Sequence, residues 1–307
     1  MSFTSVSHVS KAYGNIQALS DFSLEIDEAQ IVALVGPDGA GKTTLIRIMC
    51  HLLDMDEGEV TIDGKDVSKQ FDDIKNILGY MPQQFSLYQD LTVEENLRFY
   101  AGIYGFTGEP FRKKKEQLYE FSQLGPFATR RAGALSGGMK QKLALSCALL
   151  HDPKILILDE PTTGVDPLSR RYFWEMLAQL KREGVTILVS TPYMDEAALS
   201  DKTCAIYGGR KLTEGTPDEL ASQYRGTIYF ADREPTSKLV QDISSADDLT
   251  ARRFGTGMNL YVKEGKQLDN YSDHLRNLGI DTASLKKMTP SVEDRFIQLM
   301  EEQRNHG

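Results

Sequence analysis

The sequence predicts an α/β fold with a mainly parallel β-sheet flanked by helices, followed by a small α+β domain. Three runs, at residues 31–35, 155–158 and 185–189, are apolar except for Thr186, and such runs are typical of strands buried on both faces. Helical patterns separate these runs, and strands that alternate with helices favour a parallel sheet. A glycine-rich loop directly follows the first run, at residues 36–44.

The chain has 307 residues, which is long for one compact domain. We therefore expect a large domain over residues 1–217 and an accessory α+β domain over residues 218–307. No apolar run approaches the ~18 residues that a membrane span requires, and the first residues lack the pattern of a secretory signal. These features predict a cytoplasmic protein that reaches a membrane only through a partner.

The charge and the cysteine content of the chain exclude some classes of function. The formal net charge of −9 argues against general nucleic-acid binding, so we expect no nucleic-acid partner. The basic run at residues 112–115 is interpreted as a solvated helix face, with a contact to anionic lipid or to a partner loop as the alternative. Cys50, Cys147 and Cys204 lack metal-ligand spacing and are expected to be reduced core thiols.

Weaker patterns predict the elements of the N-terminal third. Residues 3–9 and 22–26 alternate apolar and polar positions, as half-buried strands do. Tyr13-Gly14 indicates a turn, and residues 58–64 indicate a short strand bounded by glycines. Residues 71–78 predict a helix.

From residue 91 onward the pattern becomes helical, which predicts a helical subdomain at about residues 88–150. Thr92 and Glu95 have the spacing of a capping box at the start of its first helix. Further helices are expected over residues 111–124, from residues 135–139 onward and over residues 173–181. In the accessory domain, the sequence pattern predicts a strand at residues 227–230, a short helix and a strand at residues 257–262. A helix at residues 268–278, another strand and a terminal helix at residues 292–300 should follow.

The glycine-rich loop carries the first chemical signal. Its residues are Gly36, Pro37, Asp38, Gly39, Ala40, Gly41, Lys42, Thr43 and Thr44. A strand, this loop and a following helix form a phosphate-binding P-loop. Its three glycines are expected to take positive φ and let backbone N–H groups approach phosphate oxygens. Lys42 would bind the β- and γ-phosphates and Thr43 would join the shell of a Mg²⁺ ion, so the chain should bind a nucleoside triphosphate.

The second apolar strand ends in two acidic residues. Asp159 is expected to leave the strand beside the P-loop and to hold Mg²⁺ through water. Glu160 points differently and can polarise a water molecule for attack on the γ-phosphate. Such a pattern alone also fits an ordinary strand end. Together with the P-loop, the pair predicts a site that hydrolyses the nucleotide.

With these motifs, residues 3–217 resemble the nucleotide-binding subunit of an ABC transporter. The discriminating motif is Leu135-Ser136-Gly137-Gly138-Met139, which is similar to the signature of that family. The resemblance implies the P-loop NTPase fold of the family's ATPase domain, with an N-terminal antiparallel β subdomain and an inserted helical subdomain. It also implies that ATP and Mg²⁺ are the ligands, enclosed between two subunits. Ser136, Gly137 and Gly138 would start a helix whose positive end meets the γ-phosphate held by the other subunit.

Further positions match motifs of the family one by one. Tyr13 stands where the family has an aromatic ring that stacks on adenine, with a structural tyrosine as the alternative. Gln83 matches the glutamine that reaches the metal and the attacking water, with Gln84 as the alternative register. Asp166 resembles an aspartate that contacts the other subunit. The resemblance thus implies catalytic roles for Lys42, Gln83 and Glu160, and metal contacts for Thr43, Gln83 and Asp159.

Two positions depart from the family pattern. Asp38 replaces a usual asparagine and should change affinity only mildly. Pro192 stands at the position of the switch histidine, and it has neither a side-chain donor nor a backbone N–H. Because losing one preorganised donor typically costs roughly 10²–10³ in turnover, we expect slow hydrolysis that still depends on Glu160. Alternatively, Thr191 or an ordered water supplies the missing contact.

The subtype depends on short stretches. The Ser-Gly-Gly-Met sequence, residues 162–167 and residues 290–294 resemble ATPases paired with ABC-2-type permeases. This implies a peripheral subunit at the inner face of the plasma membrane. It would power a separate permease that exports drugs, lipids or related hydrophobic or polysaccharide cargo, with a second copy of the chain as its dimer partner. A hydrolysis-impaired cassette in a heterodimer and a regulatory, non-transport ABC ATPase are the alternatives.

Overall fold

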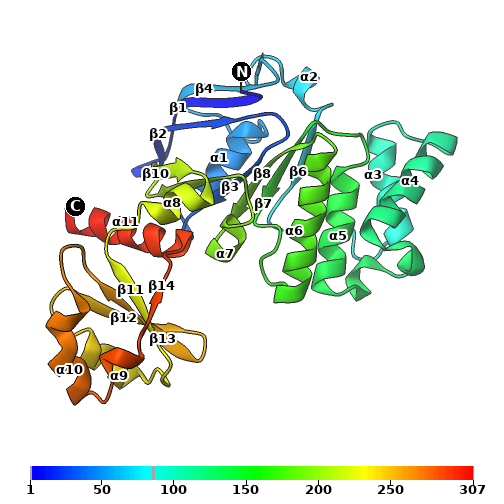
Figure 1. The fold of residues 1–307 in the computed structure, drawn as a ribbon. Helices are drawn as coiled ribbons and strands as arrows, with labels where there is room; N and C mark the ends of the chain where they lie inside the picture. The colour runs from blue at the N-terminus through cyan, green and yellow to red at the C-terminus, as the bar shows by residue number, and fades with distance from the viewer. Residues whose placement is uncertain (1, 85–86, 307) are drawn as a thin grey trace. The chain divides into compact units, whose positions relative to one another are not determined.

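The structure is a computed structural model that describes residues 2–84 and 87–306. It divides into two compact units between Pro217 and Asp218, and each unit has its own core (Figure 1). Within the described ranges, no helix is both long enough and apolar enough to cross a membrane.

A six-stranded sheet forms the centre of the first unit. Its strands, in spatial order, are β10 (Arg210–Gly215), β9 (Lys202–Tyr207), β3 (Ile31–Val35), β8 (Thr186–Thr191), β7 (Ile155–Asp159) and β6 (Leu78–Met81). All neighbours pair in parallel except the edge strand β10. Every residue of β3, β7 and β8 is buried, so the three apolar runs are confirmed as central strands covered on both faces.

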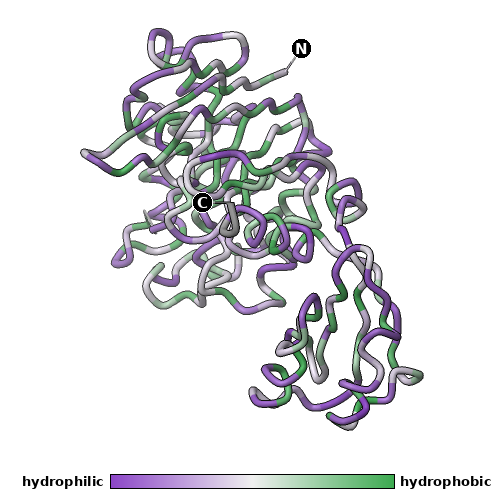
Figure 2. Tube along the Cα trace, turned by 90° about the vertical axis from the view of Figure 1, so that its left-hand side faces the viewer, coloured by the Kyte–Doolittle hydropathy of each residue, from purple (hydrophilic) through white to green (hydrophobic). Residues whose placement is uncertain are grey.

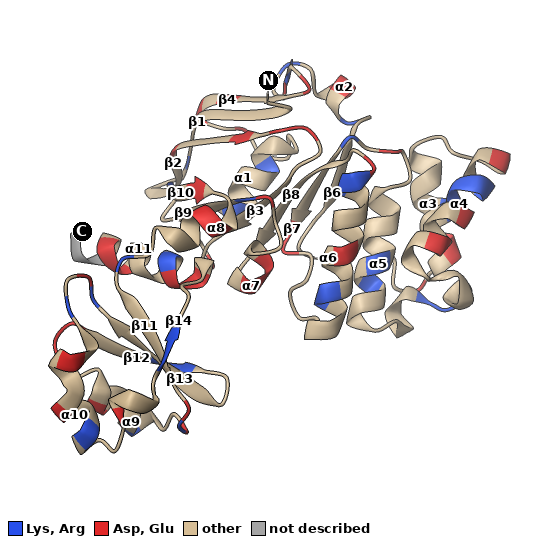
Figure 3. Cartoon of the chain, in the orientation of Figure 1, with Lys and Arg blue, Asp and Glu red and all other residues tan. Residues whose placement is uncertain are grey.

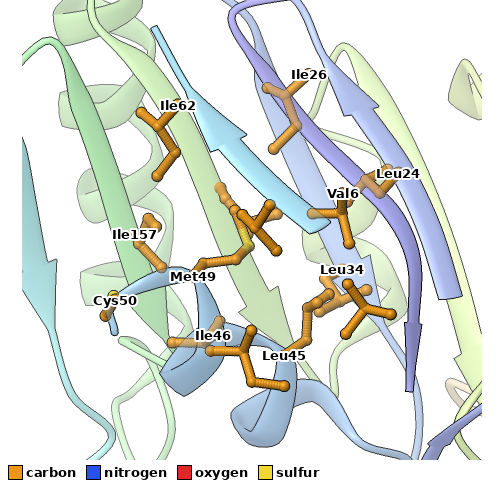
Figure 4. Packing of buried hydrophobic residues seen from close by; sticks show 14 of the residues in the cluster. Val6, Leu24, Ile26, Leu34, Leu45, Ile46, Met49, Cys50, Ile62 and Ile157 are labelled. Atoms are coloured by element: carbon orange, nitrogen blue, oxygen red, sulfur yellow. The ribbon is translucent and has the colours of Figure 1, made fainter. Parts of the chain in front are cut away.

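A four-stranded antiparallel sheet packs above the P-loop helix. Its order is β2 (Ile16–Ile26), β1 (Thr4–Tyr13), β4 (Glu57–Ile62) and β5 (Lys65–Asp66). Helix α1 (Lys42–Met49) shares one hydrophobic core with both sheets. Figure 4 shows Ile46 and Met49 of α1 among side chains from both sheets, such as Ile62 and Ile157. This packing holds the start of α1 at the carboxyl end of β3.

The predicted helical region contains α3 (Val93–Ile103), α4 (Gly108–Ser122) and α5 (Gly137–Ala148). The capping box at Thr92 and Glu95 is confirmed, with both reciprocal hydrogen bonds present. On α4, Arg112, Lys114 and Lys115 form ion pairs with Glu109, Asp152 and Glu94 respectively. Figure 3 shows the opposite charges side by side on α3 and α4. The basic run is therefore largely neutralised on the helix surface.

The remaining helices of this unit are α2 (Phe71–Ile74), η1 (Gly125–Phe127), η2 (Ala132–Ala134), α6 (Pro167–Arg182) and α7 (Met194–Ala197). Helices α6 and α7 both contact β3 and β8, whereas α1 contacts β7 and β2. Because β3, β7 and β8 pair in parallel, their carboxyl ends lie at one edge of the sheet, where the candidate site forms.

One helix prediction was wrong in its extent. The helix expected over residues 71–78 ends at Ile74, and Leu78 begins strand β6. Leu78 pairs with Ile155 of β7, and a Cβ on Gly79 would lie 2.6 Å from the side chain of Leu156. Close sheet packing therefore decides this segment, which a local helical pattern cannot show.

The second unit is an antiparallel sheet with helices. The strand order is β12 (Leu249–Phe254), β13 (Gly257–Val262), β11 (Thr227–Ala231) and β14 (Lys286–Met288). The helices are α8 (Pro217–Ser222), which begins at the division between the units, α9 (Ser237–Ile243), η3 (Leu268–Tyr271), α10 (Ser272–Asn277), η4 (Thr282–Ser284) and α11 (Val292–His306). Hydrophobic and hydrophilic stretches alternate along its trace (Figure 2). Strand β12 was not predicted from the sequence, because Leu249 and Ala251 are its only buried residues and three of the other four positions are polar.

Candidate nucleotide-binding site

The P-loop lies at the carboxyl end of β3 and leads into α1. Gly39 and Gly41 have φ values of +76° and +110°, as predicted. The prediction was wrong for Gly36, which does not have a positive φ. Position 36 requires glycine because there is no room for a side chain: a Cβ there would lie 2.3 Å from the carbonyl oxygen of Ile206.

A cavity of about 310 Å³ opens beside the loop. Its walls are the P-loop residues from Asp38 to Thr44, residues 16–18 of β2, and the side chains of Gln83 and Glu160. Segments that are far apart in the sequence therefore meet at this cavity, and they include P-loop, Gln83 and Glu160 side chains that were expected to bind a triphosphate.

Lys42 is held inside the loop by three oxygen atoms. Its Nζ donates to the carbonyl oxygens of Gly36 at 2.8 Å and Pro37 at 3.1 Å. Oε1 of Glu160 lies 3.1 Å from the same Nζ, and the Lys42 side chain is only 4 % exposed. A buried charge of this kind requires compensation, which the carboxylate supplies in this conformation.

Asp159 and Thr43 lie together, as expected for a metal site. The pairing of Asp159 with Ser190 across β7 and β8 lets Ser190 Oγ donate to Asp159 Oδ1 at 2.7 Å. Thr43 Oγ1 donates to the same oxygen at 3.2 Å. A hydroxyl and a carboxylate are hard oxygen donors, which suit Mg²⁺, an ion that usually takes one or two carboxylates, phosphates and waters. The residues present therefore fit this ion.

Glu160 is fixed by the neighbouring strand and by Gln83. Its backbone N–H donates to Ser190 Oγ at 2.9 Å, and the residue has a φ of +48°, which is unusual for a side chain of its type. Gln83 Nε2 donates to Glu160 Oε2 at 3.0 Å. Thr163 Oγ1 donates to the same oxygen at 3.3 Å. Backbone strain of this kind is often found at functional sites.

Replacing Asp159 by asparagine should raise the melting temperature of the nucleotide-free protein. Burial, followed by the charge of Glu160, raises the pKa of Asp159 above its ordinary value, against the hydroxyls of Ser190 and Thr43, which lower it. The native state then binds more protons than the unfolded state, so stability falls as pH rises from the ordinary pKa to the raised one.

We expect a gain in melting temperature at pH 8, where each 1 kcal/mol of stability corresponds to roughly 2–4 °C in a domain of this size. The gain should be smaller at pH 5, as thermal unfolding of both proteins at the two pH values would show. An Asp159→Asn variant that melts below the unmodified protein at pH 8 would contradict the expectation.

Besides Gly36, Pro37 and Asp159, the predicted site residues that do not line this cavity are Tyr13, the signature residues and Asp166. Tyr13 ends β1 and is 46 % exposed. Ser136 is the N-cap of α5, and Asp166 is the N-cap of α6. Gly138 packs so closely on α6 that a Cβ would lie 2.7 Å from the Ser169 hydroxyl. The signature loop (Ser136–Gly138) and the Asp166 turn therefore adjoin each other within one chain, outside the wall of its own cavity.

Pro192 directly follows β8, and no histidine lines the cavity walls formed by the described residues. The preceding residue, Thr191, donates its hydroxyl hydrogen to Oε2 of Glu196 at 2.6 Å. Its oxygen accepts the backbone N–H of Tyr193 at 3.0 Å. In this conformation the Thr191 hydroxyl is thus engaged in the protein interior, which argues against its replacing a histidine.

Two residues of the site, Ser190 and Ile16, were not predicted from the sequence. Ser190 bonds to both Asp159 and Glu160, and its signal was a polar residue near the end of an apolar strand that adjoins β7. Ile16 lines the cavity and is 70 % exposed. Its only signal was an apolar residue just after the predicted turn at residue 13.

Comparison with known proteins agrees with this geometry. Residues 19–163 match the family model described as ABC transporter. The Escherichia coli K12 protein named "Probable multidrug ABC transporter ATP-binding protein YbhF" is 40 % identical over 287 residues, covering 92 % of this chain and 49 % of that protein. The chain thus spans about half the length of this relative.

A second relative matches along almost its whole length. The Nod factor export ATP-binding protein I of Rhizobium etli is 33 % identical over 298 residues, covering 95 % of this chain and 92 % of that protein. The dimeric cassette MJ0796 in a post-hydrolysis state with ADP and Pi is 29 % identical, covers 69 % of this chain and 98 % of its own, and has a TM-score of 0.63. The chain therefore belongs to the ABC transporter ATP-binding proteins, a family whose activity is ATP hydrolysis coupled to transport.

Proposed function

We propose that this chain binds and hydrolyses ATP as the energy-coupling subunit of an ABC exporter. The observation that carries the proposal is the meeting of Lys42, Thr43, Gln83 and Glu160 around one cavity, with Asp159 hydrogen-bonded to Thr43. A cation, a hydroxyl, an amide and two carboxylates at this site correspond to the requirements of phosphoryl transfer, which are charge neutralisation and placement of the attacking water.

Lys42 would exchange its partners when ATP binds. Its Nζ now contacts two loop carbonyls and Glu160, all oxygen acceptors that the β- and γ-phosphates of ATP can replace. Release of this ion pair leaves the Glu160 carboxylate free to hold a water molecule and accept its proton. Gln83, already bonded to Glu160, would orient the same water. Thr43 and Asp159 would hold Mg²⁺, which neutralises charge on the phosphate oxygens when it is bound.

The functional unit in this proposal is a pair of subunits that enclose two ATP molecules. The signature loop and Asp166 do not line the chain's own cavity, and both begin helices that present N–H groups. Such a helix N-terminus favours a phosphate group. A second subunit would bring its signature loop to the open side of the cavity, in keeping with the dimeric relative that holds ADP and Pi.

A Ser136→Glu variant tests the pairing. A carboxylate at this N-cap would face the γ-phosphate of the partner subunit, so we expect ATP-dependent dimerisation and ATPase activity to fall at least tenfold. ATP affinity of the single chain should be retained. Size-exclusion chromatography with light scattering in magnesium-ATP measures the first effect. Thr236→Glu is the matched control, because Thr236 caps α9 of the accessory domain by the same side-chain bond. Equal dimerisation of both variants would contradict the pairing.

Slow turnover is part of the proposal. Pro192 offers no hydrogen to a γ-phosphate, and the Thr191 hydroxyl is bonded to Glu196. The enclosed ATP would therefore be cleaved late, and the closed dimer would persist longer than one that contains a histidine at this position. Glu160 supplies the remaining catalysis.

The proposed partner is a separate ABC-2-type permease, with this subunit bound at the inner face of the plasma membrane. Docking at α3 is supported by exposed apolar side chains, since Phe99 and Ile103 of α3 are 41 % and 63 % exposed. Tyr88, which precedes α3 and packs against Phe99, is 48 % exposed. The names of the relatives, which mention multidrug transport and Nod factor export, favour export of drugs, lipids or related hydrophobic or polysaccharide cargo. Co-purification with a permease encoded by a neighbouring gene would test this assignment.

A second candidate function is that of a weakly hydrolysing cassette in a heterodimer. Pro192 favours this alternative, because a partner cassette with a histidine could perform most of the cleavage. Retention of Glu160 and Ser136 favours the homodimer. The two candidates differ in what co-purifies with the chain, namely a permease alone or a permease with a second, different cassette.

A further inference from the structure

Next to the proposed catalytic site, three chain segments meet at one buried carboxylate. Glu196 of α7 is 2 % exposed. Its Oε1 accepts a hydrogen bond from Thr162 Oγ1 at 2.7 Å, and its Oε2 accepts one from Thr191 Oγ1 at 2.6 Å. Nη1 of Arg170 lies 3.6 Å from Oε1. We refer to these four residues as the Glu196 cluster.

Two members of the Glu196 cluster lie at the carboxyl ends of the neighbouring strands β7 and β8. Thr162 lies two residues after Glu160, on the turn that leads to Asp166, and Thr191 immediately precedes Pro192. Arg170 belongs to α6, which begins at that turn. One carboxylate thus joins the segment that carries Glu160 to the segment that carries Pro192.

Arg170 strengthens the link on the side of Pro192. Its guanidinium carbon lies 4.3 Å from the centre of the Tyr193 ring, and its Nη2 donates to Asp195 Oδ2 at 3.3 Å. Residues on both sides of Pro192 are therefore held, Thr191 by Glu196 and Tyr193 by Arg170. The segment is anchored although Pro192 itself can donate no hydrogen bond.

The energetics explain why this arrangement is stiff. A buried carboxylate without partners is costly, whereas hydrogen bonds to a charged acceptor are short and strong. The hydroxyls of Thr162 and Thr191 are completely buried, and each directs its single hydrogen at Glu196. Movement of either segment away from the other would break a bond that water could not easily replace.

We infer that Glu196 is a positioning residue for the ATPase reaction, which holds the Glu160 and Pro192 segments in fixed register around the γ-phosphate. This inference rests on the proposed function. Its physical basis is that misplacement of a reacting group by about 1 Å can cost as much as 10²-fold in rate. Glu196 acts through Thr162 and Thr191 and does not itself line the cavity.

The test uses threonine-to-valine changes, which delete a hydroxyl and keep the side-chain shape. Thr162→Val and Thr191→Val each remove one bond to Glu196. Thr186→Val is the matched control, because Thr186 lies at the other end of β8, is completely buried, and accepts one hydrogen bond from the Ala29 N–H at 3.1 Å. Loss of the Thr186 hydroxyl should lower the stability of the protein in the same way, but it should not change the geometry of the cavity.

We expect kcat for ATP to fall about tenfold in both cluster variants, with KM within twofold of its normal value, and to stay unchanged in Thr186→Val. Thr191→Ser should restore kcat, since it returns the hydroxyl. Cluster variants whose kcat, corrected for the folded fraction, matches that of Thr186→Val would overturn the inference.

Hydrogen exchange provides a readout that does not depend on ATP hydrolysis. Thr162→Val should increase exchange at the Tyr193 amide, and Thr191→Val should increase it at the Val165 amide, because the two segments are coupled through Glu196. Confinement of each effect to the mutated segment would overturn the coupling. If the unmodified chain hydrolyses no ATP while this coupling is present, the proposed function fails and the link between the segments stands.

Discussion

Replacement of Glu160 by glutamine is expected to reduce ATP hydrolysis by roughly 10²–10⁴-fold, the usual contribution of a general base. The amide has nearly the shape of the carboxylate but cannot accept a proton from the attacking water. ATP binding should persist, because the P-loop residues that line the cavity are unchanged. The variant should therefore accumulate as an ATP-bound dimer, visible by size-exclusion chromatography with magnesium-ATP.

The same change should destabilise the protein when no nucleotide is present. Lys42 loses its buried charged partner, and breaking such a pair typically costs about 3–5 kcal/mol. ATP should reverse the loss, since its phosphates replace the carboxylate. Glu175→Gln on the exposed face of α6 serves as a control for the chemical change alone, because the ion pair of Glu175 with Arg171 is exposed to solvent. Full ATPase activity in the Glu160→Gln variant would exclude Glu160 as the base.

Replacement of Pro192 by histidine is expected to raise the ATPase rate roughly 10²–10³-fold, by returning a preorganised donor to the charge that develops on the γ-phosphate. The neighbouring contacts favour correct placement of the ring, because Thr191 and Tyr193 are held by Glu196 and Arg170. The steady-state rate in magnesium-ATP is the measurement, together with the lifetime of the ATP-bound dimer, which should shorten.

Pro192→Ala is the matched control for the Pro192→His variant. It removes the ring and restores a backbone N–H but adds no side-chain donor. If alanine raises the rate as much as histidine does, the limiting factor is the rigidity or the missing N–H of proline. A rate for Pro192→His that is equal to or below that of the unmodified chain would contradict the explanation of slow turnover.

Local sequence patterns were sufficient to predict the P-loop and the two acidic residues at the end of β7. Residues 36–44 specify their own conformation through glycines at positive φ, and residues 155–160 combine an apolar strand with acids at its end. Both signals are contained in fewer than ten consecutive residues. The same pattern reading missed Ser190, because its meaning depends on which strand lies beside β7.

The sequence by itself determined the α/β class, the P-loop and the absence of a hydrogen-bond donor at Pro192, since each depends on residue types and short-range spacing. Only the tertiary structure decided that Glu160 is paired with Lys42 and that Glu196 joins the segments of Thr162 and Thr191. The physical reason is that buried charges are stabilised by partners that are distant in sequence. Strand order and helix packing select those partners, and no local pattern records them.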